Sequence, residues 1–187
     1  MVTSPRVAAV VLAGGRSRRF GTDKLSADVA GRPLLDSALG TALAVADAGV
    51  VVVGPVERAL PAGVEVTREE PAYAGPFAAV AAGLELVDAD LVLVLAGDLL
   101  DPSGAAPALL AALGREARAD AAVVVDGEGR RQPLLSAFRV PALRGCVAGV
   151  DTTGRAASEL LDGMHVVELR DPAAWSHDVD TPDDLPG

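Results

Sequence analysis

The chain has 187 residues, half of them hydrophobic but only 3% aromatic, and a formal net charge of -10. This length and composition predict one domain whose substantial core is built from Ala, Val and Leu. The negative charge argues against nucleic acid as a partner, because phosphate backbones require a basic surface. The single cysteine, Cys146, excludes an internal disulfide and fits the reducing cytoplasm, where we expect the protein to act.

The first residues do not resemble a targeting segment. MVTSPR is polar, and the apolar run VAAVVLAGG is too short for a signal peptide and ends in glycines. The most apolar later run, LVLVLAG (91–97), has the length of a strand and is well below a membrane span. We therefore expect a soluble protein with no membrane partner.

Apolar segments alternate with helix-like segments along the chain. The expected strands are 7–13, 49–53, 63–67, 90–96, 120–125, 133–139 and 164–169. The expected helices are 34–47, 76–87, 104–117, 154–162 and a short one that starts near Thr181. Several strands are apolar on both faces, which is typical of strands covered by helices on each side. The alternation predicts a single α/β domain with an open, mainly parallel sheet, and GEGRR (127–131) predicts an antiparallel hairpin near one edge.

The loop after the first strand, GGRSRRFGTDK, contains three glycines and four basic side chains. Glycines let backbone N–H groups surround an anion, and the basic side chains add positive charge, so the loop predicts a phosphate-rich ligand. The spacing matches neither the Walker P-loop nor the G-x-G-x-x-G dinucleotide fingerprint. A solvated basic turn is the alternative interpretation.

Lys24, at the end of this loop, is the only lysine in the chain, whereas fifteen residues are arginine. A solvated basic position in this chain would be expected to be arginine. Lysine is a compact point charge, and arginine is a planar fork that does not replace it where a phosphate is met end-on. The exception therefore favours a phosphate contact for Lys24.

Asp98 follows the most hydrophobic expected strand, 90–96. In open α/β sheets, ligands bind outside the carboxyl ends of the strands, which is where this carboxylate lies. Mg²⁺ prefers oxygen ligands, so Asp98 is a candidate magnesium ligand. The alternative is that Asp98 only caps the following turn.

LAGGRSRRFGTDK (12–24) resembles the signature LAGG-x-S-x-R-M/F-G-x-D-K of the molybdenum cofactor guanylyltransferases, which are Rossmann-like nucleotidyltransferases. The resemblance continues through Gly75-Pro76, Asp98, QPL (132–134) and DVDTPDDL (178–185). It implies one nucleotidyltransferase domain over residues 1–187, with a Rossmann-like sheet of the nucleotide-diphospho-sugar transferase type. It also implies transfer of GMP from GTP to molybdopterin with Mg²⁺ as cofactor, and transient contact with molybdenum-insertion proteins or molybdoenzymes.

The resemblance assigns roles to particular residues. Those implied for nucleotide binding are Leu12, Ala13, Gly14, Gly15, Lys24, Glu69 and Asp98, and those for catalysis are Lys24, Asp98 and Arg19. Asp98 is the candidate metal ligand, and Asp180 is a candidate for a second one; the alternative is that Asp178 and Asp180 reflect a chain that contains no asparagine. Gln132 and Arg131 are candidates for the molybdopterin phosphate, with Arg130 and Arg139 nearby, although an exposed basic hairpin explains them equally well. Glu69 and Glu70 both fall where the family carries its guanine-site acid, and the spacing leaves the choice between them open.

Several positions depart from the family pattern. The Asn after the second strand is replaced by Gly54 or Pro55, and the Met-Pro or Thr-Pro after the central Asp is replaced by Leu99-Leu100. DVD (178–180) resembles the D-x-D of the cytidylyltransferase relatives, whereas LAGG with Asp before Lys favours the guanylyl branch. The alternatives are therefore a cytidylyltransferase that uses CTP, or a non-catalytic homologue that binds nucleotide or cofactor.

Overall fold

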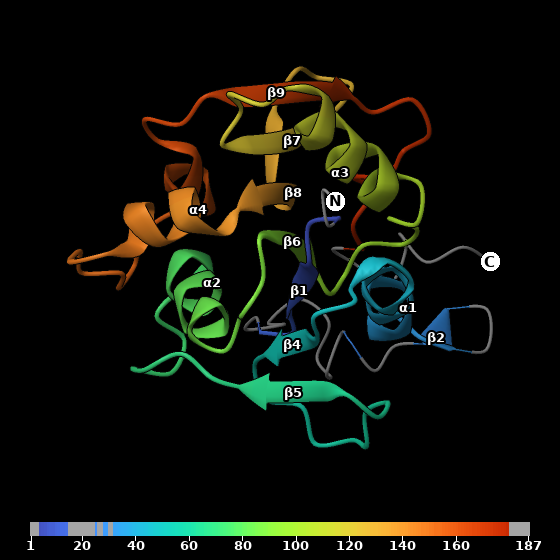
Figure 1. The fold of residues 1–187 in the computed structure, drawn as a ribbon. Helices are drawn as coiled ribbons and strands as arrows, with labels where there is room; N and C mark the ends of the chain where they lie inside the picture. The colour runs from blue at the N-terminus through green and yellow to red at the C-terminus, as the bar shows by residue number, and fades with distance from the viewer. Residues whose placement is uncertain (1–3, 15–24, 26–27, 30–31, 180–187) are drawn as a thin grey trace.

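The computed structural model describes residues 4–14, 25, 28–29 and 32–179 (Figure 1). One seven-stranded sheet has the order β5-β4-β1-β6-β8-β7-β9. Its strands are β1 (Val7–Leu12), β4 (Val50–Val53), β5 (Val64–Thr67), β6 (Leu91–Ala96), β7 (Ala121–Val125), β8 (Arg131–Arg139) and β9 (Val166–Arg170). Only β8 runs antiparallel to its neighbours in this sheet, which confirms the mainly parallel arrangement. A separate two-stranded sheet pairs β2 (Asp28–Val29) with β3 (Arg32–Pro33).

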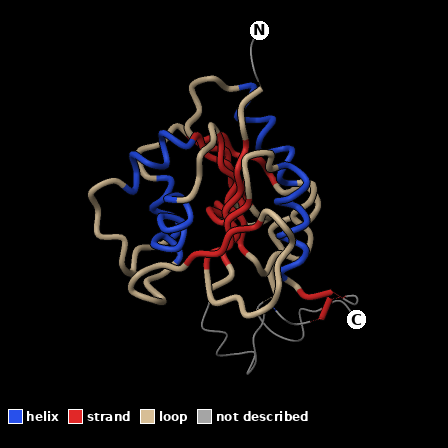
Figure 2. Tube along the Cα trace, turned by 60° about the horizontal axis from the view of Figure 1, so that its bottom comes forward, coloured by secondary structure: helices blue, strands red, loops and turns tan. Residues whose placement is uncertain are grey.

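Helices cover both faces of the sheet, as Figure 2 shows with the strands between two groups of helices. The helices are α1 (Leu35–Val45), α2 (Pro76–Glu85), α3 (Ala105–Arg115), α4 (Val140–Val147) and the 3₁₀ helix η2 (Ala157–Leu161). α1 and α3 pack on one face, and α2, α4 and η2 pack on the other. The molecule is therefore a three-layer α/β domain.

Successive residues of the central strands alternate between the two cores. In β1, Ala9 and Val11 contact the α1 and α3 side, whereas Ala8 and Val10 contact the α2 side. Side chains of a strand point to opposite faces in turn, so a strand buried on both faces is apolar throughout. This explains why the segments predicted as the central strands are continuous apolar runs.

The sequence predicted every strand of the main sheet to within two residues, and the antiparallel hairpin between β7 and β8 is confirmed. The helix predicted at 154–162 is a shorter 3₁₀ helix, Ala157–Leu161, and the helix predicted from Thr181 lies outside the described residues. The sequence missed α4, which begins at Val140, the residue directly after β8. No loop residues separate the two elements, so Pro141 in the first turn of α4 is the only sequence signal of the boundary.

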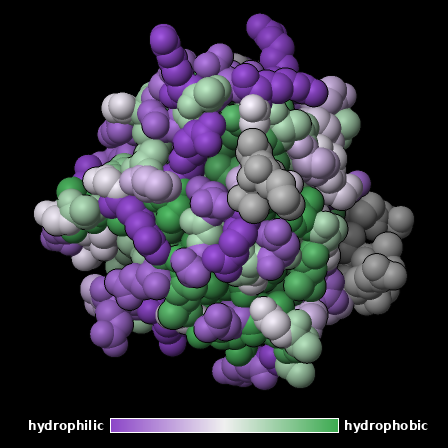
Figure 3. Space-filling model, viewed as in Figure 1, coloured by the Kyte–Doolittle hydropathy of each residue, from purple (hydrophilic) through white to green (hydrophobic). Residues whose placement is uncertain are grey.

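The surface mixes polar and apolar side chains. Figure 3 shows hydrophilic residues interspersed with hydrophobic ones across the face seen in Figure 1. Within the part of the chain that the structure describes, none of the helices is long and apolar enough to cross a membrane.

Gly83 allows α2 to approach the sheet closely. A Cβ at Gly83 would lie 2.7 Å from Cγ1 of Val10 and 2.9 Å from Cγ2 of Val53. We expect Gly83→Ala to lower the free energy of unfolding by about 1–3 kcal/mol, because β-branched neighbours cannot move away cheaply. Gly40, inside α1, has nothing within 4 Å of such a Cβ, so Gly40→Ala is the matched control and should stabilise by about 0.5–1 kcal/mol. Urea unfolding of both variants measures the difference; a stabilised Gly83→Ala variant would contradict this packing.

Candidate active site

The carboxyl ends of β1, β4, β5 and β6 are joined at one edge of the sheet by backbone hydrogen bonds. The amide of Ala13 donates to the carbonyl of Val53 at 2.8 Å, and the amide of Gly97 donates to the carbonyl of Leu12 at 2.9 Å. The amide of Gly54 donates to the carbonyl of Thr67 at 3.0 Å. The residues just beyond the four strands therefore meet at the edge where α/β sheets bind ligands.

Glycine is required at this edge because the chains approach so closely. Gly54 has φ +142°, and a Cβ there would lie 2.5 Å from the carbonyl carbon and oxygen of Ala13. A Cβ at Gly97 would lie 2.8 Å from the carbonyl oxygen of Leu12. No side chain fits at position 54 with this backbone, which gives a physical reason for the missing Asn.

The predicted phosphate loop begins at this edge. Leu12 and Ala13 are buried at the end of β1, and Gly14 is exposed beyond them. Gly15, Arg19 and Lys24 lie outside the described residues, so their roles stay predictions from the sequence.

Asp98 lies in the turn after β6, partly buried between buried Gly97 and buried Leu99. A segment from the far end of the chain pairs with this turn. Leu99 forms an antiparallel bridge with Asp178, the amide of Leu100 donates to the carbonyl of His177 at 3.0 Å, and the amide of Val179 donates to the carbonyl of Asp98 at 3.1 Å. The second candidate metal ligand, Asp180, follows Val179 in the chain and lies outside the described residues.

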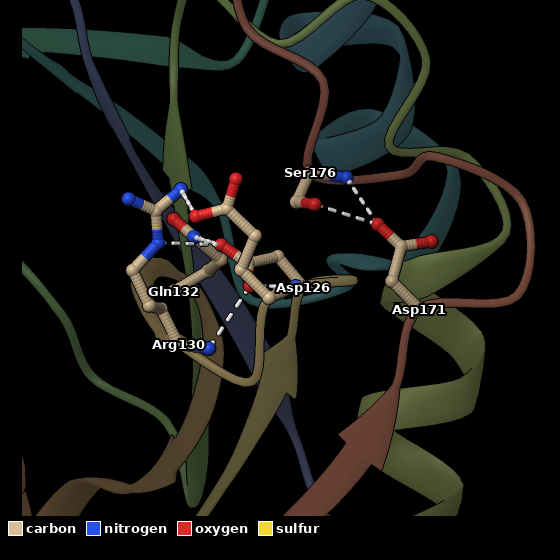
Figure 4. Close-up of polar contacts among 6 residues, drawn as sticks. Asp126, Arg130, Gln132, Asp171 and Ser176 are labelled. Carbon is tan, nitrogen blue, oxygen red and sulfur yellow. Dashed lines mark hydrogen bonds and ion pairs between the residues drawn. The ribbon is translucent and has the colours of Figure 1, made fainter.

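The segment that reaches Asp98, residues 171–179, is here named the C-terminal strap. Asp171 Oδ1 accepts from the amides of Ala173 at 3.1 Å and Trp175 at 2.9 Å. Asp171 Oδ2 accepts from the amide of Ser176 at 2.8 Å and from its hydroxyl at 2.7 Å (Figure 4). Burial acts to raise the pKa of Asp171, but the hydrogen bonds from Ser176, Trp175 and Ala173 outweigh it, and the pKa is lowered. These hydrogen bonds therefore favour the charged form of the Asp171 carboxylate, around which the first half of the strap folds.

The loop between β5 and α2 distinguishes the two candidate guanine-site acids. Glu69 is 7% exposed, and its Oε1 accepts from the amide of Tyr73 at 2.9 Å, whereas Glu70 is exposed. The amide of Gly154 donates to the carbonyl of Ala74 at 2.6 Å and anchors the end of the same loop. The Glu69 carboxylate thus braces its own loop, whatever contact it makes with a ligand.

Arg155 belongs to the region anchored on that loop. Its guanidinium lies 5.0 Å from the ring centroid of Phe77 and donates to Glu159 at 2.8 Å. Glu159 Oε1 also accepts from the amide of Ala156, as in a helix start. These contacts pair the Arg155 side chain within the start of η2.

The start of β8 lies at the same edge as Asp98, because β8 runs antiparallel to β6. Gln132 donates from Nε2 to Asp126 Oδ2 at 2.8 Å, and Arg131 donates from Nε to Glu168 Oε1 at 2.7 Å. Figure 4 shows Asp126 accepting from Gln132 and Arg130, with Asp171 and Ser176 on the neighbouring segment. The backbone hydrogen bond from Arg130 is the largest cause that lowers the pKa of Asp126. Asp126 therefore organises the hairpin together with Arg130 and Gln132, and a separate ion pair joins Arg131 to Glu168 of β9.

Arg139 lies at the other end of β8 and does not join this network. It donates to the carbonyl of Ala119 at 2.8 Å and to the carbonyl of Leu113 at 3.0 Å. The suggestion that Arg139 helps to receive a phosphate beside Gln132 is therefore wrong, because a nine-residue strand separates the two ends. Its role is to satisfy carbonyls around the end of α3.

Sequence reasoning missed Asp126 and Asp171. Asp171-Pro172 is a typical turn-initiating pair, and Asp126-Gly127 is another, so both signals were present. Both side chains accept hydrogen bonds from the backbone of their own turn, as such residues commonly do.

Residues 9–166 match the family described as the MobA-like NTP transferase domain. The chain belongs to this family. It is 31% identical over 190 aligned residues to a protein of Chloroflexus aggregans named "Probable molybdenum cofactor guanylyltransferase", covering 94% of this chain and 90% of the relative. The family match makes it a nucleotidyltransferase, and confirms the resemblance seen in the first loop.

Solved structures share the fold. An Rv0371c homologue from Mycobacterium sp. strain JC1 is 25% identical and has a TM-score of 0.76, with 96% of this chain and 92% of that chain covered. Molybdopterin-guanine dinucleotide biosynthesis protein A from Archaeoglobus fulgidus is 22% identical with a TM-score of 0.69, with 95% and 94% covered. Their likeness to the chain confirms the predicted fold class.

The Gly54→Ala variant tests whether the close approach of Gly54 to the backbone of Ala13 matters for nucleotide binding. We expect Gly54→Ala to unfold at lower denaturant and to bind nucleotide at least tenfold more weakly, because its Cβ would collide with the backbone of Ala13. Gly49 also has a positive φ, +104°, but nothing lies within 4 Å of an added Cβ, so Gly49→Ala isolates the cost of the dihedral angle. Urea unfolding and nucleotide titration measure both effects, and equal losses in the two variants would show that contact with Ala13 plays no part.

Proposed function

We propose that this chain transfers GMP from GTP to the phosphate of molybdopterin and releases pyrophosphate. The observation that carries the proposal is the family match over residues 9–166 together with 31% identity to a protein named for that activity. The meeting of Leu12–Gly14 with the Asp98 turn at one sheet edge supports it. Contacts with molybdenum-insertion proteins or molybdoenzymes in the cytoplasm belong to the same proposal.

The reaction needs positioning more than proton transfer. An oxygen of the molybdopterin phosphate attacks the α-phosphorus of GTP and forms a new P–O bond, while the bond from that phosphorus to the bridging oxygen breaks and its electrons leave with pyrophosphate. The attacking phosphate is already ionised, so no general base is required. We assign Lys24, Arg19 and the amides of the glycine loop to the charge of the triphosphate.

The residues of the site fit a magnesium ion. Asp98 and Asp180 provide carboxylate oxygens, the donors that Mg²⁺ prefers, and magnesium in such enzymes commonly binds one or two carboxylates plus substrate phosphates. Among the described residues, which do not include Asp180, there is no cluster of three or more His, Cys, Asp or Glu side chains. When bound, the ion would neutralise charge on the phosphates.

The start of β8 is the region that we assign to molybdopterin. Gln132 and Arg131 lie at the Asp98 edge, and each is oriented by an acid, Asp126 and Glu168 respectively. Arg131 is exposed, so its guanidinium keeps donors for a phosphate beyond the one that Glu168 accepts.

The role of Asp98 is tested by comparing the Asp98→Asn and Asp90→Asn variants. Asp90 lies just before β6, and its carboxylate accepts a hydrogen bond from the amide of Arg6 at 2.8 Å. With molybdopterin, Mg²⁺ and GTP, we expect Asp98→Asn to reduce pyrophosphate release roughly 100-fold or more, because a ligand to the charge-neutralising ion is weakened. Asp90→Asn should change the rate by less than about twofold. Unchanged release in Asp98→Asn would remove Asp98 from the metal site.

The choice of nucleotide is tested separately by competition between GTP and CTP for binding. We expect GTP to be preferred, and a clear preference for CTP would replace the guanylyl assignment by the cytidylyl one.

Lys24 is tested by exchanging the two kinds of cation in the first loop. We expect Lys24→Arg to lose most of the activity, because a planar guanidinium does not replace a point charge against a phosphate. Arg18→Lys should lose little. Steady-state pyrophosphate release measures both variants, and equal losses would contradict the special role of the single lysine.

A further inference from the structure

We infer that Asp171 and Trp175 are positioning residues that fix Asp98 through the C-terminal strap. The inference rests on the proposed function, because it concerns the metal that Asp98 is assigned to hold. The first step is that β1 holds one side of the Asp98 turn. On that side, Gly97 is bonded to the carbonyl of Leu12 and leaves no room for a side chain.

The strap holds the other side of the turn. His177 and Val179 make backbone hydrogen bonds on either side of the Leu99–Asp178 bridge, so Asp98 and Leu100 are each tied to the strap by one bond. The hydroxyl of Ser37 in α1 also donates to the carbonyl of Leu100 at 2.5 Å. The peptide that carries the Asp98 side chain is thus fixed by β1, α1 and the strap together.

The Asp171 side chain holds the backbone of the strap in the conformation that reaches the Asp98 turn. One carboxylate accepts four hydrogen bonds from the strap, and the amide of Asp171 itself donates to the carbonyl of Val125 at 2.9 Å. Within this turn Ala174 has φ 55°, a left-handed conformation that is unfavourable for a residue with a Cβ. Such strain persists only where surrounding contacts determine the backbone.

Trp175 fixes the strap against α3. A Cβ at Gly104 would lie 2.5 Å from Nε1 of Trp175, so the indole rests on the backbone at the start of α3. Trp175 also packs against the core between the sheet and α1 and α3. The strap is therefore bonded to β7 at its start, packed on α3 at its centre and paired with the Asp98 turn at its end.

Groups that orient a metal ligand typically change metal affinity about 10–100-fold when they are removed. Asp171→Asn keeps the shape of the side chain but loses acceptors, because an amide nitrogen does not accept. Gly104→Ala displaces the indole of Trp175 without changing the sequence of the strap. The matched control is Asp47→Asn, since Asp47 accepts from the amide of Val7 at 2.7 Å at the opposite edge of the sheet.

The test measures Mn²⁺ binding to the full chain by electron paramagnetic resonance, with GTP present. We expect about tenfold weaker Mn²⁺ binding in Asp171→Asn and a loss in the same direction in Gly104→Ala, with Asp47→Asn unchanged. In pyrophosphate release, the KM for Mg²⁺ should rise with little change in kcat at saturating Mg²⁺. Hydrogen exchange should accelerate at the amides of Leu100 and Val179 and not at those of β1.

The outcomes separate this inference from the proposed function. If Asp98→Asn weakens Mn²⁺ binding and Asp171→Asn does not, the metal assignment stands and the positioning role is overturned. If Asp98→Asn leaves Mn²⁺ binding unchanged, the metal assignment itself fails. Equal acceleration of exchange throughout the sheet in Asp171→Asn would show general destabilisation and would also overturn the positioning role.

Discussion

The close approach of the β1 and β4 strand ends is the constraint on which the site depends. The peptide between Ala13 and Gly14 lies against Gly54 so closely that no Cβ fits at position 54. The same strand edge receives Gly97 on its other side, bonded to Leu12. Because these contacts are between backbone groups, they define where the first loop and the Asp98 turn begin, and side chains only extend from that framework.

Strands that run in opposite directions contribute residues to the site. β1, β4 and β6 reach the edge with their carboxyl ends, whereas β8 starts there. The first group carries the residues assigned to nucleotide and metal, and β8 carries those assigned to molybdopterin. Asp171 lies between the two regions, since its amide bonds to β7 and its carboxylate organises the strap that reaches Asp98. The strap therefore starts beside β7 and ends at the Asp98 turn.

The sequence predicted much of this arrangement because its signals are local. Continuous apolar runs identified the strands, and a short Gly-rich turn identified the β7–β8 hairpin. The different burial of Glu69 and Glu70 depends on how the loop folds back on Tyr73, which the sequence does not show. The lack of space at Gly54 depends on the backbone of another strand, and the pairing of Leu99 with Asp178 joins distant segments. Such contacts leave no pattern in a single sequence.

The pairing of Leu99 with Asp178 also has a consequence for biosynthesis. A ribosome releases the chain N-terminus first, so β1, β4 and β6 are available for pairing before residues 177–179 have been made. During that interval the turn after β6 lacks the neighbour that closes it. A nascent chain therefore acquires the completed turn, and any ligand affinity that depends on it, only after residues 177–179 have been made.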